Sequence, residues 1–163
     1  MTTIYVDNIA PNLQSKVSAP NLTLPTGSVI QVVQAKLTST PTTNSTSFVD
    51  TGLSVTITPT SSSSKILVMA DYGAGSNNSS NGMITQLVRG STSLFYRGDS
   101  YSSSGGVFGA GSFSHLDSPA TTSAVTYKIQ FLSQGSTTTM SFNPTYNGYV
   151  SPTSHLTVME IAG

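Results

Sequence analysis

The 163-residue chain has no formal net charge, and only 7% of its residues are Asp, Glu, Lys or Arg. A typical domain carries roughly 25% of these residues, so the chain lacks the basic surface on which nucleic-acid binding depends. It contains no cysteine, which excludes disulfides and thiolate metal sites. We therefore expect no nucleic-acid partner. Any binding function must use a neutral surface that is rich in hydroxyl groups.

The composition also favours an all-β fold. Ser and Thr make up about a third of the chain, and good helix formers for exposed positions are nearly absent. The length suits one domain with a hydrophobic core of its own. The amino terminus has neither the basic start nor the apolar core of a signal peptide. No apolar segment reaches membrane-spanning length, so we expect no membrane insertion.

Residues 1–27 differ in character from the rest of the chain. Pro11, Pro20 and Pro25 each lack an amide donor and bias the residue before them toward extended conformations. Such a segment can hardly build a core alone. We predict an extended amino-terminal attachment arm at 1–27, packed on another chain, followed by a single domain at 28–163.

Short apolar or alternating runs, separated by Ser, Gly and Pro clusters, follow the arm and predict strands rather than helices. The predicted strands are 28–37, 48–58 with a break near Gly52, 65–72, 83–89, 93–96, 107–115, 125–132, 137–142 and 156–161. Loops are expected at 73–81, 98–106 and 143–152. About eight to ten short antiparallel strands with long connections are typical of a jelly-roll β-sandwich. The predicted strands at 28–37 and 156–161 would be neighbours in one sheet.

Residues 65–72 form the longest apolar run in the sequence. Side chains alternate across a strand, so Val68 and Met69 point to opposite sides, and both sides of this run are apolar. Residues 156–161 show the same property. One face would fill the sandwich and the other would meet neighbouring copies about a three-fold axis. The sequence leaves open which face points outward.

Several segments carry a resemblance to a known family. They are 27–34 (GSVIQVVQ), 48–59 (FVDTGLSVTITP), 63–68 (SSKILV), 87–92 (LVRGST), 116–122 (LDSPATT) and 156–162 (LTVMEIA). Through them the chain resembles virion surface proteins of marine tailed bacteriophages, of the tail-fibre or particle-fibre type, from about residue 28 to the end. Residues 4–9 (IYVDNI) are similar to the attachment arms of such proteins. The resemblance implies a trimeric jelly roll of the tumour-necrosis-factor type and supplies no catalytic residue.

The function expected from these observations is structural. The protein would be a bacteriophage virion protein, a homotrimeric fibre or capsid-decoration protein on the particle surface. Residues 1–27 would attach it to other virion proteins, and its exposed loops would contribute to host attachment. Two other classes stay open. A free carbohydrate-binding module would not need the arm, and a small hydrolase would turn over a glycan substrate.

Five tyrosines beside or within the predicted loops are candidate glycan-contact residues: Tyr72, Tyr96, Tyr101, Tyr146 and Tyr149. A tyrosine ring can stack on a sugar ring while nearby Asn and Asp groups bind its hydroxyls. The alternative is that these rings pack at one end of the sandwich or between subunits.

Other motifs carry weaker signals, and we expect no catalytic residue, metal or cofactor. His115 and Asp117 would share one face of a strand, but a metal needs three or four ligands. No nucleophile-elbow sequence accompanies this pair. The tripeptide 97–99 (RGD) matches an integrin-binding motif, yet its Gly and Asp are ordinary turn residues. Gly73 and Gly75 lack the third glycine of a dinucleotide-binding loop.

Overall fold

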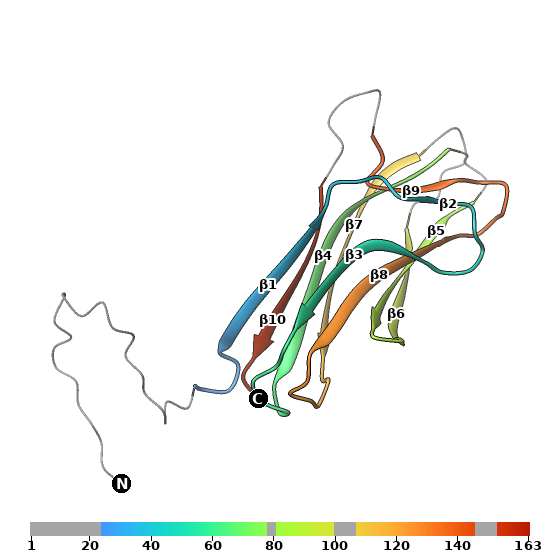
Figure 1. Ribbon diagram of the computed structural model, residues 1–163. Helices are drawn as coiled ribbons and strands as arrows, with labels where there is room; N and C mark the ends of the chain where they lie inside the picture. Colours follow the sequence, from blue (N-terminus) through green and yellow to red (C-terminus); the bar gives the residue numbers. More distant parts are fainter. Residues whose placement is uncertain (1–23, 78–80, 100–106, 146–152) are drawn as a thin grey trace, which may run out of the picture.

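The computed structural model describes residues 24–77, 81–99, 107–145 and 153–163. In this part of the chain ten β-strands and no helix are present, and the strands form two antiparallel sheets packed face to face (Figure 1). The strands are β1 (Val29–Leu37), β2 (Thr42–Thr43), β3 (Val49–Ile57), β4 (Lys65–Ser76), β5 (Met83–Arg89), β6 (Thr92–Asp99), β7 (Val107–Asp117), β8 (Val125–Ser133), β9 (Met140–Phe142) and β10 (Ser154–Ile161). The predicted all-β sandwich is confirmed, while residues 1–23 of the predicted arm lie outside the described residues.

The strands follow a jelly-roll order. One sheet has the order β1-β10-β4-β7, with β9 and β2 continuing it past the end of β10, and the other has the order β3-β8-β5-β6. From β3 onward the chain passes repeatedly between the two sheets, so neighbours within a sheet are mostly distant in sequence (Figure 1). β1 pairs antiparallel with β10 along its length, which confirms the predicted pairing of the first and last strands.

Alternation of side chains places one face of each central strand in the core. In β3, β4, β8 and β10 the inward side chains are almost wholly shielded from solvent, among them Leu53, Val55, Ile57, Ile66, Val68, Tyr127, Ile129, Phe131, Leu156 and Val158. Each large apolar side chain buried in this way contributes roughly 1.5–3 kcal/mol, which offsets the entropy lost when the chain is ordered. The alternation predicted for β3 and β8 is therefore confirmed.

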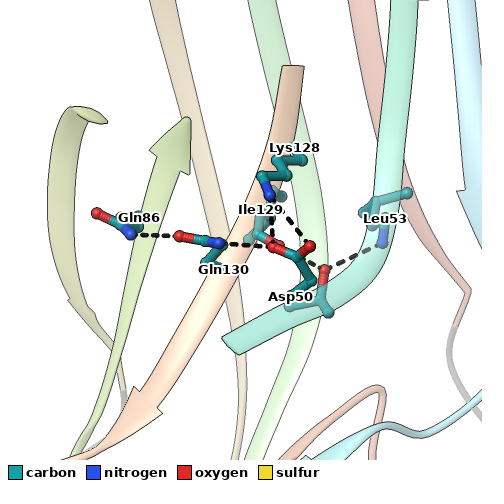
Figure 2. A network of polar contacts seen from close by, with 7 residues as sticks. Asp50, Leu53, Gln86, Lys128, Ile129 and Gln130 are labelled. Atoms are coloured by element: carbon teal, nitrogen blue, oxygen red, sulfur yellow. Dashed lines mark hydrogen bonds and ion pairs between the residues drawn. The ribbon is translucent and has the colours of Figure 1, made fainter. Parts of the chain in front are cut away.

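A bulge at Gly52 replaces the predicted break in β3. Gly52 adopts a φ of +86°, a conformation that glycine tolerates far better than other residues, and the register against β8 shifts around it. The Thr51 hydroxyl bridges the irregularity. It donates to the Ile129 carbonyl at 2.8 Å and accepts from the Leu53 amide at 3.1 Å (Figure 2). β3 consequently continues through the bulge as one strand.

The predicted loop at 73–81 is wrong over its first part, because β4 continues to Ser76. Backbone pairing with β7 and β9 holds this extension. Close packing here depends on Gly111 of β7, where an added Cβ would lie 2.3 Å from the ring of Tyr72. The absence of a side chain at this position makes room for a buried aromatic ring.

Gly111→Ala should destabilise the fold by roughly 1–3 kcal/mol, the usual cost of forcing an extra methyl group into a packed core. The matched control is Gly98→Ala on β6, where nothing lies within 4 Å of the added Cβ. Denaturant unfolding followed by circular dichroism measures both variants. Equal unfolding midpoints for the two would contradict the packing role of Gly111.

Glu160 of β10 is fully shielded from solvent and is held by hydrogen bonds. Its carboxylate accepts from the Gln31 amide at 2.6 Å, and from the Thr60 backbone amide and hydroxyl at 2.7 and 2.8 Å. Burial acts to raise the pKa of Glu160, but the donors on Gln31, Ser64 and Thr60 outweigh it and lower the pKa to about 2. The Ser64 hydroxyl also lowers the pKa of Glu160, although it does not meet the geometry of a hydrogen bond. The carboxylate therefore ties β10 to β1 and to the connection after β3.

Glu160→Gln tests this contact through its pH dependence. The pKa of Glu160 is lower in the folded state than the unfolded value of 4.5. The ionised carboxylate therefore stabilises the fold fully above about pH 4.5. That stability is lost as the pH falls toward 2. At neutral pH the variant should lose about 1–3 kcal/mol of unfolding free energy, because its NH2 group faces hydrogen-bond donors.

Urea titrations at a series of pH values measure the difference between the two proteins. It should shrink as the pH falls through the window between the unfolded and folded pKa values of Glu160. A difference that stays constant over that window would show that the charge of Glu160 does not stabilise the fold.

Candidate functional site

An apolar row crosses the outer face of the β1-β10-β4-β7 sheet. The strand register aligns its four side chains, Val32, Met159, Leu67 and Leu116. Cross-strand partners share a face of the sheet, and this face points away from the sandwich core. Val32 is 54% exposed and Leu116 is 51% exposed, so the row presents apolar surface to its surroundings.

A second uncharged row lies beside the first and consists of Gln34, Thr157, Met69 and Ser114. Met69 is 42% exposed, whereas its neighbour Val68 is fully buried, which settles which face of β4 points outward. The surface is hollowed around Met69 between β10, β4 and β7. The two rows together are called the apolar face below.

Charged side chains border the apolar face and do not interrupt it. Lys36, His155 and Asp71 form the next row along the strands, and His155 Nδ1 lies 3.0 Å from an Asp71 carboxylate oxygen. Lys65 lies beyond the opposite side, in register with Ile161. An apolar centre with a polar rim is the usual anatomy of a protein–protein interface.

A row of polar side chains joined by hydrogen bonds, called the polar row below, crosses the outer face of the β3-β8-β5-β6 sheet (Figure 2). Lys128 and Gln130 donate to the Asp50 carboxylate at 3.0 and 2.6 Å. Gln86 donates to Gln130 at 2.5 Å, and Ser93 donates to Gln86 at 2.9 Å. The hydrogen bond from Lys128 is the main cause that lowers the pKa of Asp50 below its usual value. An ionised carboxylate therefore lies at one end of this polar row.

An aromatic pair lies on the same face of this sheet as the polar row. The rings of Phe48 and Tyr96 have centroids 5.6 Å apart. Tyr96 lies opposite Gln86 in the register of β5 and β6, so the two side chains share the outer side of the sheet. Tyr96 is 64% exposed, and its ring is thus backed by Phe48 and largely open to solvent.

Of the five predicted glycan-contact tyrosines, the structure describes Tyr72 and Tyr96. Tyr72 lies inside the sandwich, where its ring stacks on Phe142 at 4.9 Å and its hydroxyl pairs with that of Thr85 at 2.9 Å. Its expected role in binding a glycan is wrong, because β4 continues past it and the ring packs in the core. Tyr96 is exposed, on a strand. Outside the described residues lie Tyr101, Tyr146 and Tyr149.

His115 and Asp117 take part in two separate packing contacts. The buried Asp117 carboxylate accepts from Arg89 at 2.8 and 2.7 Å and from the Tyr127 hydroxyl at 2.7 Å. Arg89 and Tyr127 belong to the opposite sheet, so this cluster joins the two layers. Burial, and after it the hydrogen bond to Asp117, raises the pKa of Tyr127. His115 lies against Phe95 with ring centroids 5.4 Å apart.

The other motifs lie in regular strands. The tripeptide 97–99 belongs to β6 and pairs with the start of β5, and Arg97 donates to the Ser112 carbonyl of β7. Gly73 and Gly75 lie within β4. Among the described residues, no three potential metal ligands gather in one place. That same part of the chain has no helix long and apolar enough to cross a membrane.

Sequence reasoning missed the residues of the polar row. Asp50, Gln86 and Gln130 are ordinary polar positions when the sequence is read alone, and only the register of three strands brings them together. The available signal was the alternation of residues 125–132, which places Gln130 on the solvent side of its strand. This alternation predicts the side of the strand that Gln130 faces, but it does not identify the residues that Gln130 contacts.

Comparison with known proteins assigns no family, since no protein-family model and no curated protein matches the chain. Function is therefore inferred from the two outer faces of the sandwich together with the resemblance carried by the sequence segments.

Proposed function

We propose that the protein is a structural protein of a bacteriophage particle that assembles as a homotrimer through its apolar face. Residues 1–27 attach it to other virion proteins, and it serves on the particle surface as a fibre or decoration protein that contributes to host attachment. It has no catalytic role. The observation that carries the proposal is the pair of uncharged rows on the outer side of the β1-β10-β4-β7 sheet.

The energetic argument concerns the exposed side chains of that face. In a single chain Val32, Met69 and Leu116 leave apolar surface in contact with water. Covering such surface yields roughly 25 cal/mol per Å², and monomeric proteins rarely expose large contiguous apolar patches without a use. Another copy of the same chain is a suitable cover, because the centre of the face carries no charge that would need a partner across the interface.

The sequence resemblance is the basis for proposing three copies and a bacteriophage particle. The segments 27–34, 63–68 and 156–162, which carry part of it, fall largely in β1, β4 and β10, and these strands contribute to the apolar face. In a three-fold ring each copy offers two different parts of its surface to its two neighbours. A face that is four strands wide suits such an arrangement.

The catalytic alternative has little to support it. Asp117 is buried and accepts hydrogen bonds from Arg89 and Tyr127, and His115 packs on Phe95. A hydrolase needs a base within hydrogen-bond reach of its nucleophile and a third group that orients the base. The two groups that could have started such a triad are engaged in separate contacts.

Two adjacent substitutions in β4 test the assembly. Val68→Asp places a charge in the core and should unfold the subunit, because an unpaired buried charge costs several kcal/mol. Met69→Asp places the charge on the apolar face and should leave a folded monomer. Thr56→Asp, at an exposed position of the other sheet, is the control and should leave the wild-type mass. Circular dichroism reports folding and light scattering reports mass. A folded Met69→Asp variant with the wild-type trimeric mass would rule out this interface.

Removal of residues 1–23 tests the attachment arm. The remaining chain keeps the bonds that close the domain, since the Gly27 amide donates to the Ala162 carbonyl and the Ala162 amide to the Ser28 carbonyl, both at 2.8 Å. We expect a folded trimer that is missing from purified particles when it replaces the full-length protein. Truncated protein found in particles at the full-length amount would refute the anchoring role.

A further inference from the structure

The outer face of the β3-β8-β5-β6 sheet combines the two elements that sugar binding requires. One is the exposed ring of Tyr96, held in place by Phe48 at a centroid distance of 5.6 Å. The other is the hydrogen-bonded row that ends at Asp50 (Figure 2). An amphipathic sugar ring needs an apolar surface for its C–H groups and polar groups for its hydroxyls.

The strand register places Tyr96 and Asp50 at the two ends of one row. Asp50 lies opposite Gln130, Gln130 opposite Gln86, and Gln86 opposite Tyr96, in a single row across four strands. Phe48 is two residues before Asp50 and therefore shares its face of the chain. Because the ring of Tyr96 reaches Phe48, the aromatic surface extends across the sheet toward the carboxylate.

The carboxylate is prepared to receive hydroxyl donors. Asp50 is 55% exposed at its side chain, and its pKa is lowered mainly by the hydrogen bond from Lys128. Lys128 and Gln130 fix its orientation, and a carboxylate has about four acceptor sites, so acceptor capacity remains. Hydrogen bonds to an ionised oxygen are roughly twice as strong as neutral ones.

We propose that this face is a binding site for a neutral pyranose, as part of a surface glycan. The apolar side of the sugar ring stacks on Tyr96, and two of its hydroxyls donate to Asp50 and to the side-chain carbonyl of the half-buried Gln130. An acidic sugar is disfavoured, because the charge of Lys128 is already compensated by Asp50 and the carboxylate repels a second anion.

The site uses the sheet opposite to the apolar face, so assembly through that face leaves it uncovered. Binding itself does not depend on the proposed trimer; only the use of the site in host attachment rests on the proposed function. The site also differs from the loop sites expected from the sequence, since Tyr96 is on a strand and its polar partners come from β3, β8 and β5.

Saturation-transfer NMR on the full-length protein tests the site with methyl glycosides of galactose, glucose, mannose, fucose and N-acetylglucosamine. At least one should bind with a millimolar Kd, whereas the methyl glycoside of sialic acid should not bind. Tyr96→Ala should weaken binding by about tenfold or more, which corresponds to the loss of a stacking contact. Asp50→Asn should weaken it several-fold, and Tyr96→Phe should retain it.

Thr56→Ala is the control, because Thr56 is exposed on the same sheet, four residues beyond Gly52 and outside the row. It should bind as the wild type does. Melting curves confirm that each variant is folded, and the mass of each sample reports assembly separately from binding. No transfer to any neutral glycoside, or undiminished binding by folded Tyr96→Ala, would overturn the proposal whatever the mass.

Discussion

β4 and β10 carry apolar side chains on both faces, and a two-layer sandwich can bury only one face of each strand. The inward face, with Val68 and Val158, meets the side chains of the opposite sheet and is fully shielded. Among the residues that the structure describes, no second layer covers the outward face. With only six basic and six acidic residues in the whole protein, charges are too few to cover it. This constraint links the composition of the chain to its expected assembly.

The few charged residues mostly hold strands together. Asp117 joins the two layers through Arg89, and Glu160 fastens the last strand to its neighbours. A buried carboxylate is costly unless it is paired or hydrogen-bonded, so each of these contacts favours one arrangement of strands over others. On the outside, Asp50 organises a row of amides by the same means. The apolar face, by contrast, has charges only at its border.

Much of the fold could be predicted, because alternation and turn residues act locally. The hairpin of β5 and β6, the inward residues of β8 and the pairing of β1 with β10 all follow from such patterns. The extension of β4 to Ser76 did not, because the glycines at 73 and 75 predict a loop until their backbone pairing with β7 is known. The site residues were harder still. Tyr72 and Tyr96 look alike in sequence, and only the tertiary packing puts one in the core and the other on the surface.

Sedimentation velocity of the wild-type protein at micromolar concentration tests the central claim most directly. Burial of the outward face of β4 and β10 between copies, together with the trimer expected from the sequence resemblance, predicts one stable species with three times the chain mass of 16.9 kDa. Large apolar interfaces of this kind are normally obligate, so dilution should not release single chains readily. A folded species of 16.9 kDa that persists at every concentration would contradict the claim.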